Sequence, residues 1–96
     1  MLETIKRDLA DNYRPNTDEV IVEFIAQYTT IASHSSNRKK DDIMLYPYVF
    51  TAVKEAYIRR GNEGTNSSNE GGLSSSYIDI EEKLRKDVLA IRIPLF

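Results

Sequence analysis

Apolar side chains recur every three or four residues in four stretches of this chain, and this spacing limits the fold more than any other feature. The first stretch carries the period on Leu2, Ile5, Leu9 and Tyr13. Residues three and four apart share one face of an α-helix, so each stretch predicts an amphipathic helix. The predicted helices span about residues 2–13, 17–35, 45–60 and 79–91. We expect them to pack as a small all-α bundle in a single domain, residues 1–96.

The second predicted helix has the widest apolar face and is the expected centre of the bundle. This face consists of Val20, Ile21, Phe24, Ile25, Tyr28, Ile31 and Ala32. Pro15 ends the first helix, because a proline pushes the preceding residue out of the helical region. Thr17 is then the expected N-cap, with Asp18 and Glu19 in the first turn, where the helix dipole favours anions.

Proline and glycine set the limits of the third predicted helix. Pro47 lacks an N–H and fits the first turn, so we expect the helix to begin near Leu45 or Tyr46. The alternative is a start at Asp41 with a kink at Pro47. The two cations Arg59 and Arg60 followed by Gly61 predict a helix end with a left-handed C-cap. For the fourth helix, Asp79 and Glu82 have the spacing of a capping box, and Pro94 ends the apolar pattern.

Residues 61–76 read GNEGTNSSNEGGLSSS and hold all four glycines of the chain. A connection of this length is unusual inside a compact domain. The stretch predicts a long Gly/Ser-rich loop between the last two helices. Its composition alone suggests a flexible linker. Its position between two helices of one small domain favours a functional segment.

Composition argues against several classes of protein. The chain has 96 residues, 13 Lys+Arg and 15 Asp+Glu, for a net charge of −2 and a pI near 5.4. A dedicated nucleic-acid binder usually has a pI above about 9. There is no cysteine and a single histidine, His34, so a thiolate site, a histidine metal cage or a Ser-His-Asp triad is not expected. We expect no enzyme activity, metal or cofactor, and His34 is expected on an exposed helix end.

Charge is divided unevenly along the chain. Residues 1–35 hold three Lys+Arg and six Asp+Glu, for a net −3, whereas residues 36–60 hold six and three, for a net +3. These halves could pair within one subunit or head-to-tail between neighbours, the geometry that closes into a ring. The basic run 38–40 is followed at once by two aspartates, so an ordinary solvated turn is expected there.

The end of the third helix and the following loop carry a recognisable pattern. Its residues are Arg60, Gly61, Glu63, Gly64, Gly71, Gly72, Ser74, Ser76 and Tyr77. In order they read Arg-Gly-x-Glu-Gly, then a serine-rich stretch with Gly-Gly, then Ser-x-Ser-Tyr and a closing helix. This pattern resembles the phage head–tail connector family, also called DNA-packaging proteins, of tailed bacteriophages and prophages. Chain length and helix order also match.

The resemblance implies a virion structural protein, made in the host bacterial cytoplasm during assembly. Such proteins form a ring, commonly about twelvefold, that joins the portal of the filled head to the tail and extends the DNA channel. The expected partners are further copies of the chain, the portal protein and the next connector or tail-completion protein. DNA would pass without specific binding, and no membrane is expected.

The resemblance also suggests roles for particular residues. Gly61 and Gly64 would supply backbone angles closed to other residues, and Glu63 would accept hydrogen bonds from loop amides or from a neighbour's Arg59 or Arg60. Tyr77 would anchor the return of the loop, which contacts adjacent subunits or the channel. The candidate portal-docking segment is the tail of Arg92, Ile93, Pro94, Leu95 and Phe96.

Two other functions remain open at the level of the sequence. The first is a small helical protein–protein interaction module or regulator that acts as a monomer or dimer. The second is a weak nucleic-acid binder that uses Arg38, Lys39, Lys40, Arg59 and Arg60.

Overall fold

The computed structural model describes residues 1–63 and 77–94. In this part of the chain it has four α-helices and no strand, so the predicted all-α bundle is confirmed. The α-helices are α1 (Leu2–Leu9), α2 (Asp18–Ser36), α3 (Tyr46–Glu63) and α4 (Ile78–Val88). Three short 3-10 helices adjoin them: η1 (Ala10–Asn12), η2 (Ile43–Leu45) and η6 (Leu89–Ile91).

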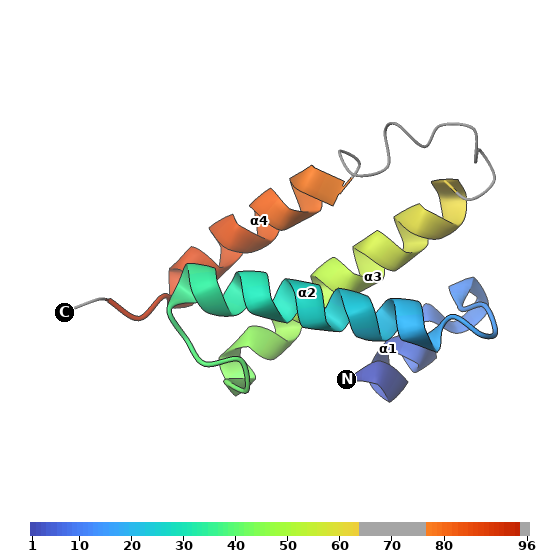
Figure 1. Ribbon diagram of the computed structural model, residues 1–96, viewed down its shortest axis with the longest axis horizontal. Helices are drawn as coiled ribbons and strands as arrows, with labels where there is room; N and C mark the ends of the chain where they lie inside the picture. Colours follow the sequence, from blue (N-terminus) through green and yellow to red (C-terminus); the bar gives the residue numbers. More distant parts are fainter. Residues whose placement is uncertain (64–76, 95–96) are drawn as a thin grey trace.

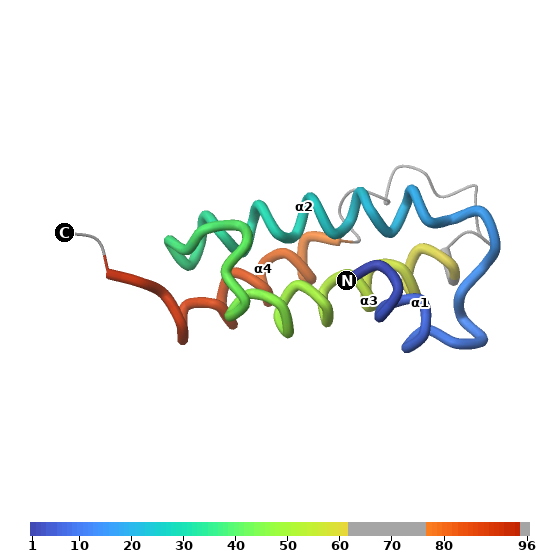
Figure 2. Tube along the Cα trace, turned by 90° about the horizontal axis from the view of Figure 1, so that it is seen from below, coloured from blue at the N-terminus to red at the C-terminus, as the bar shows by residue number. Residues whose placement is uncertain are grey.

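The helices form two layers (Figures 1 and 2). Helix α2 makes one layer and crosses over α1, α3 and α4, which make the other. Helices α3 and α4 run antiparallel beneath it. The described molecule is elongated and thin, with extents of 47 × 30 × 17 Å. The central position predicted for the second helix is therefore the one that α2 occupies.

The core lies between the two layers and takes one stripe from every α-helix. Its fully buried large residues are Ile5, Leu9, Ile21, Tyr28, Leu45, Val49, Val53, Ile80 and Val88. Burying one such aliphatic side chain contributes about 1.5–3 kcal/mol. The apolar residues whose spacing predicts the helices are thus the residues through which the helices pack.

Helix α3 begins at Tyr46, which agrees with the first of the two starts that the sequence predicts. Pro47 stands in its first turn, where the absent N–H breaks no hydrogen bond. The preceding η2 is capped by Asp42, whose carboxylate accepts a hydrogen bond from the Met44 N–H at 2.9 Å. The alternative of a helix that starts at Asp41 and kinks at Pro47 is wrong.

The predicted end of the third helix is also wrong. Helix α3 continues through Gly61 to Glu63, and Gly61 does not have a positive φ. A left-handed cap is found instead at Asn37, just after α2, with φ 58°. Asparagine tolerates this conformation because its short polar side chain bonds locally.

Thr17 is the N-cap of α2, and Asp18 and Glu19 lie in the first turn, as predicted. The Thr17 hydroxyl makes no capping bond, however, because it donates to the Arg14 carbonyl at 2.6 Å. Helix α4 begins one residue earlier than expected, with Tyr77 in the N-cap position. Asp79 therefore lies inside the first turn rather than in a capping box, and its carboxylate binds Arg59.

Candidate interaction surfaces at the two ends of the bundle

The connector-like pattern begins at the end of α3, and its last residue immediately precedes α4. Arg59 of α3 and Asp79 of α4 join the two helices there, with N–O distances of 2.6 and 3.1 Å. A bidentate pair of this kind fixes orientation as well as distance. The hydrogen bond from the Arg59 guanidinium holds the pKa of Asp79 below its ordinary value. The two helix ends on either side of residues 64–76 are thus held together.

Three residues of the predicted loop site lie at this end of the bundle. Tyr77 is half-buried and packs on Phe24 of α2, with 5.9 Å between ring centroids. Arg60 is exposed at the end of α3. A Cβ added at Gly61 would meet no atom within 4 Å, so no close contact requires a glycine at this position.

The remaining predicted site residues fall outside the described part of the chain. In the loop these are Gly64, Gly71, Gly72, Ser74 and Ser76, and in the tail they are Leu95 and Phe96. Glu63 is described as the last residue of α3.

The described part of the tail is attached to the far end of α2. The Ile93 N–H donates to the Ser36 carbonyl at 2.9 Å, and the Asn37 side-chain amide donates to the Ile93 carbonyl at 3.2 Å. The left-handed backbone at Asn37 turns the chain at this point. Figure 1 shows the C-terminal end of the chain at the side of the molecule away from the end of α3. The described part of the tail therefore lies away from the described residues of the connector-like pattern.

Arg38 completes this attachment. Its Nε donates to the Ile91 carbonyl at 2.6 Å, and a terminal nitrogen pairs with Asp42 at 2.9 Å. The Met44 N–H and this guanidinium hold the pKa of Asp42 below its ordinary value. The sequence placed Arg38 in a solvated turn with Lys39 and Lys40. Those two lysines are exposed, but Arg38 links the tail to the connection between α2 and α3.

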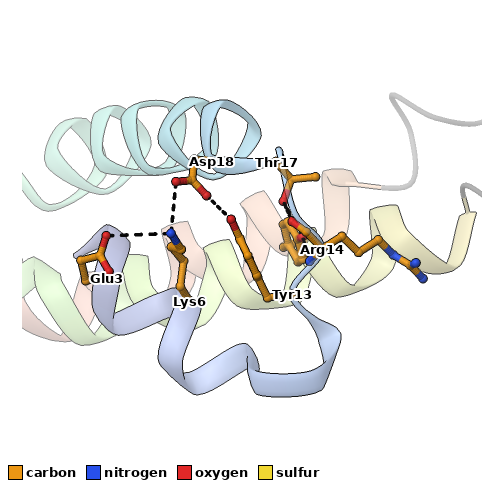
Figure 3. Close-up of polar contacts among 7 residues, drawn as sticks. Glu3, Lys6, Tyr13, Arg14, Thr17 and Asp18 are labelled. Atoms are coloured by element: carbon orange, nitrogen blue, oxygen red, sulfur yellow. Dashed lines mark hydrogen bonds and ion pairs between the residues drawn. The ribbon is translucent and has the colours of Figure 1, made fainter.

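A polar network that the sequence did not reveal joins α1 to the start of α2 (Figure 3). Asp18 accepts hydrogen bonds from Lys6 Nζ at 3.2 Å and from the Tyr13 hydroxyl. These bonds hold the pKa of Asp18 below its ordinary value, the Tyr13 contact having the larger effect. They fix the turn around Pro15. The positions of Lys6, Tyr13 and Asp18 along the chain do not indicate this network. It is seen only in the folded structure, where the three side chains meet.

The same turn is tied to α3 by Tyr57, which is almost fully buried. Its hydroxyl accepts a hydrogen bond from the Arg14 N–H at 2.9 Å and lies 2.7 Å from Thr17 Oγ1. Because Thr17 uses its hydroxyl hydrogen on the Arg14 carbonyl, Tyr57 donates to Thr17. The three residues thus form a closed ring of hydrogen bonds.

The basic residues considered for nucleic-acid binding do not form one patch. Arg59 and Arg60 lie at the end of α3, whereas Arg38, Lys39 and Lys40 follow α2 at the other end (Figure 1). Arg38 and Arg59 are also engaged by Asp42 and Asp79. His34 is exposed in the last turn of α2. Among the described residues no group of three or more His, Cys, Asp or Glu side chains is arranged to hold a metal ion.

None of the helices in residues 1–63 and 77–94 is long and apolar enough to cross a bilayer. Comparison with protein-family models, with curated proteins and with solved structures finds no match to this chain.

Proposed function

We propose that this chain is a subunit of a phage head–tail connector. In this role it forms a ring that joins the portal of the filled head to the tail and extends the DNA channel. The observation that carries the proposal is the connector-like pattern from Arg60 to Tyr77. This pattern lies between the end of one helix and the start of a second, antiparallel helix. The Arg59–Asp79 pair joins those ends, so the pattern is presented from a fixed base.

The two-ended geometry supports this role. A connector must contact one protein above it and another below it, and it therefore needs separate surfaces along its length. The described residues of the pattern, which are Arg60, Gly61, Glu63 and Tyr77, adjoin the facing ends of α3 and α4, and the attached tail leaves the other end of a molecule 47 Å long. Neither surface uses the core, so both can bind partners without unfolding the bundle.

The charge of the chain also suits a DNA channel. A net −2 per subunit gives the assembly no cationic excess with which to hold phosphates. In the described residues, several lysines and arginines are already paired within the subunit, as Lys83 is with Glu55 and Arg59 with Asp79. DNA would therefore slide past the ring rather than bind to it.

Native mass spectrometry over a wide concentration range tests the proposal. A closed ring of about a dozen copies is expected, because one repeated head-to-tail contact closes on itself. If the chain is monomeric alone, the measurement is repeated with a portal protein as template. A dimer at every concentration would contradict the proposal and favour the alternative of a small interaction module.

A further inference from the structure

Helices α3 and α4 enclose an apolar groove that the proposed function has not used. Its volume is about 260 Å³, and its floor is formed by the buried side chains of Ala52, Ile80 and Leu84. Pro47, Tyr48 and Thr51 line the α3 side. An apolar cavity of about 150 Å³ holds a benzene molecule, so this groove has room for aliphatic side chains from a partner.

The same chain carries an apolar projection that the fold leaves uncovered. Ile43 is 82% exposed, Met44 45% and Tyr46 39%, and all three belong to η2 or the first residue of α3. Ile43 is the most exposed of the large apolar residues in the described chain. Apolar side chains grouped in this way on a surface mark a site of contact with another protein.

The projection does not fill the groove of its own subunit, because none of Ile43, Met44 and Tyr46 lines it. Tyr46 and Tyr48, which lines the groove, lie about 200° apart around the axis of α3. Two copies that join through these surfaces make a head-to-tail contact, which leaves a free groove on one copy and a free projection on the other.

Charges beside the two surfaces are complementary. Arg38 and Asp42 neutralise each other next to the projection, which leaves Lys39, Lys40 and Asp41 with a net +1. At the groove, Glu55 and Lys83 form an ion pair at 3.0 Å, which leaves Asp87 with a net −1. Opposite charges of this kind favour the orientation that brings them together.

We infer that the groove between α3 and α4 receives Ile43 and Met44 of a second copy of the chain. This contact would be the subunit interface of the ring, and in that respect it rests on the proposed function. The contact buries apolar surface on both copies and repeats from copy to copy around the ring.

Engineered cysteines test this contact directly, because the chain has none of its own. Ile43→Cys and Thr51→Cys are made as separate single variants, mixed and oxidised. We expect a cross-linked dimer only in the mixture, since one cysteine lies on the projection and the other on the groove. The matched control mixes Ile43→Cys with Ala26→Cys, which is exposed on α2, and should give no cross-link.

A second pair of variants tests the energetics without a cross-link. Ile43→Glu places a charge where an apolar contact is expected and should raise the concentration for half-assembly at least about tenfold. Val22→Glu is the control, because Val22 is 49% exposed on α2 and belongs to neither surface. Both variants should keep the circular dichroism of the parent chain, since neither side chain is in the core.

The outcomes separate this inference from the proposed function. A ring without the Ile43–Thr51 cross-link, or with Ile43 cross-linked to itself, overturns the inference and leaves the connector in place. The cross-link in an open chain or a dimer supports the contact and contradicts the ring. Absence of both assembly and cross-link, with the portal protein present as template, overturns both.

Discussion

Two buried tyrosines of the core have opposite hydrogen-bonding states. The Tyr57 hydroxyl belongs to the closed ring with Arg14 and Thr17. The Tyr28 hydroxyl is buried and has no hydrogen-bond partner among the described residues. Burial raises the pKa of Tyr28 to about 12. A buried polar group without a partner loses its bonds to water and gains none in return.

The same substitution should therefore have opposite effects at the two positions. Tyr57→Phe leaves the Arg14 N–H and the Thr17 hydroxyl without their partner and should lower the free energy of unfolding by about 1–2 kcal/mol. Tyr28→Phe removes an unpaired hydroxyl and should leave stability unchanged or raise it by up to about 1 kcal/mol. Urea titration of both variants measures the difference. Destabilisation by Tyr28→Phe would mean that a group beyond the described residues bonds this hydroxyl.

Asp18 makes the stability of the fold depend on pH in the acidic range. Its pKa is lower in the folded chain than the ordinary value of 3.8, because Tyr13 and Lys6 bond the carboxylate. The stability that these bonds contribute is complete above that value and is lost as the pH falls through the lowered folded pKa. The free energy of unfolding should therefore drop below about pH 4. Asp42 and Asp79, whose pKa values are also lowered, add to this slope.

The variant Asp18→Asn should be less stable than the parent chain at pH 7 and should lose stability less steeply in acid. Chemical denaturation at several pH values between about 2 and 7 measures this slope. The exposed Asp11, changed to Asn, is the control and should keep the parent slope. A parent slope that survives in Asp18→Asn would show that the acid response comes from other carboxylates.

At the scale of elements, the end of α3 allows two parts of the connector-like pattern to be tested separately. Gly61 tests the backbone conformation, and Glu63 tests the charge. Gly61 is helical and its missing side chain faces open space. Gly61→Ala should therefore stabilise α3 by about 0.5–1 kcal/mol, because alanine loses less backbone entropy in a helix. Thermal unfolding followed by circular dichroism checks this. A lower unfolding temperature would mean that Gly61 takes a non-helical conformation in solution.

Glu63 tests the chemical half of the same pattern. Arg59 is engaged by Asp79 within its own subunit, so the exposed Arg60 is the better partner for the Glu63 carboxylate of a neighbour. Glu63→Gln should weaken ring assembly, as native mass spectrometry would measure, while the exposed Glu82→Gln should not. Equal assembly in both variants would contradict a role for the Glu63 charge.

The helices were predictable because their apolar spacing depends on local sequence alone. Pro47 also located the start of α3, since a proline without an N–H fits only the first turn. Gly61 misled, because a glycine is tolerated inside a helix at a modest cost, and the helical backbone continues through it to Glu63. The clamp made by Asn37 and Arg38 could not be foreseen, because its partners lie 53 to 56 residues further along the chain.

At the scale of the whole molecule, the clamp decides how the tail can be tested. Ile93 is bonded through both its N–H and its carbonyl to the end of α2. Removing residues 92–96 therefore removes two attachments together with the candidate docking segment. A loss of partner binding in that variant would not show whether the lost attachments or the lost segment caused it. Removing residues 94–96 spares both bonds and takes away only Pro94 and the apolar residues that follow.

The two truncations should differ in stability and agree in binding. Deletion of residues 94–96 should leave the free energy of unfolding within about 0.5 kcal/mol of the parent chain, whereas deletion of 92–96 should lower it by about 1–2 kcal/mol. Both should keep their helicity and lose binding to the portal protein in a pull-down. Asn37→Gly removes one clamp bond, suits the left-handed backbone at this position and keeps the apolar end, and should bind more weakly without losing binding. Portal binding that survives both deletions would exclude the tail as the docking segment, because every other described residue at that end is still present.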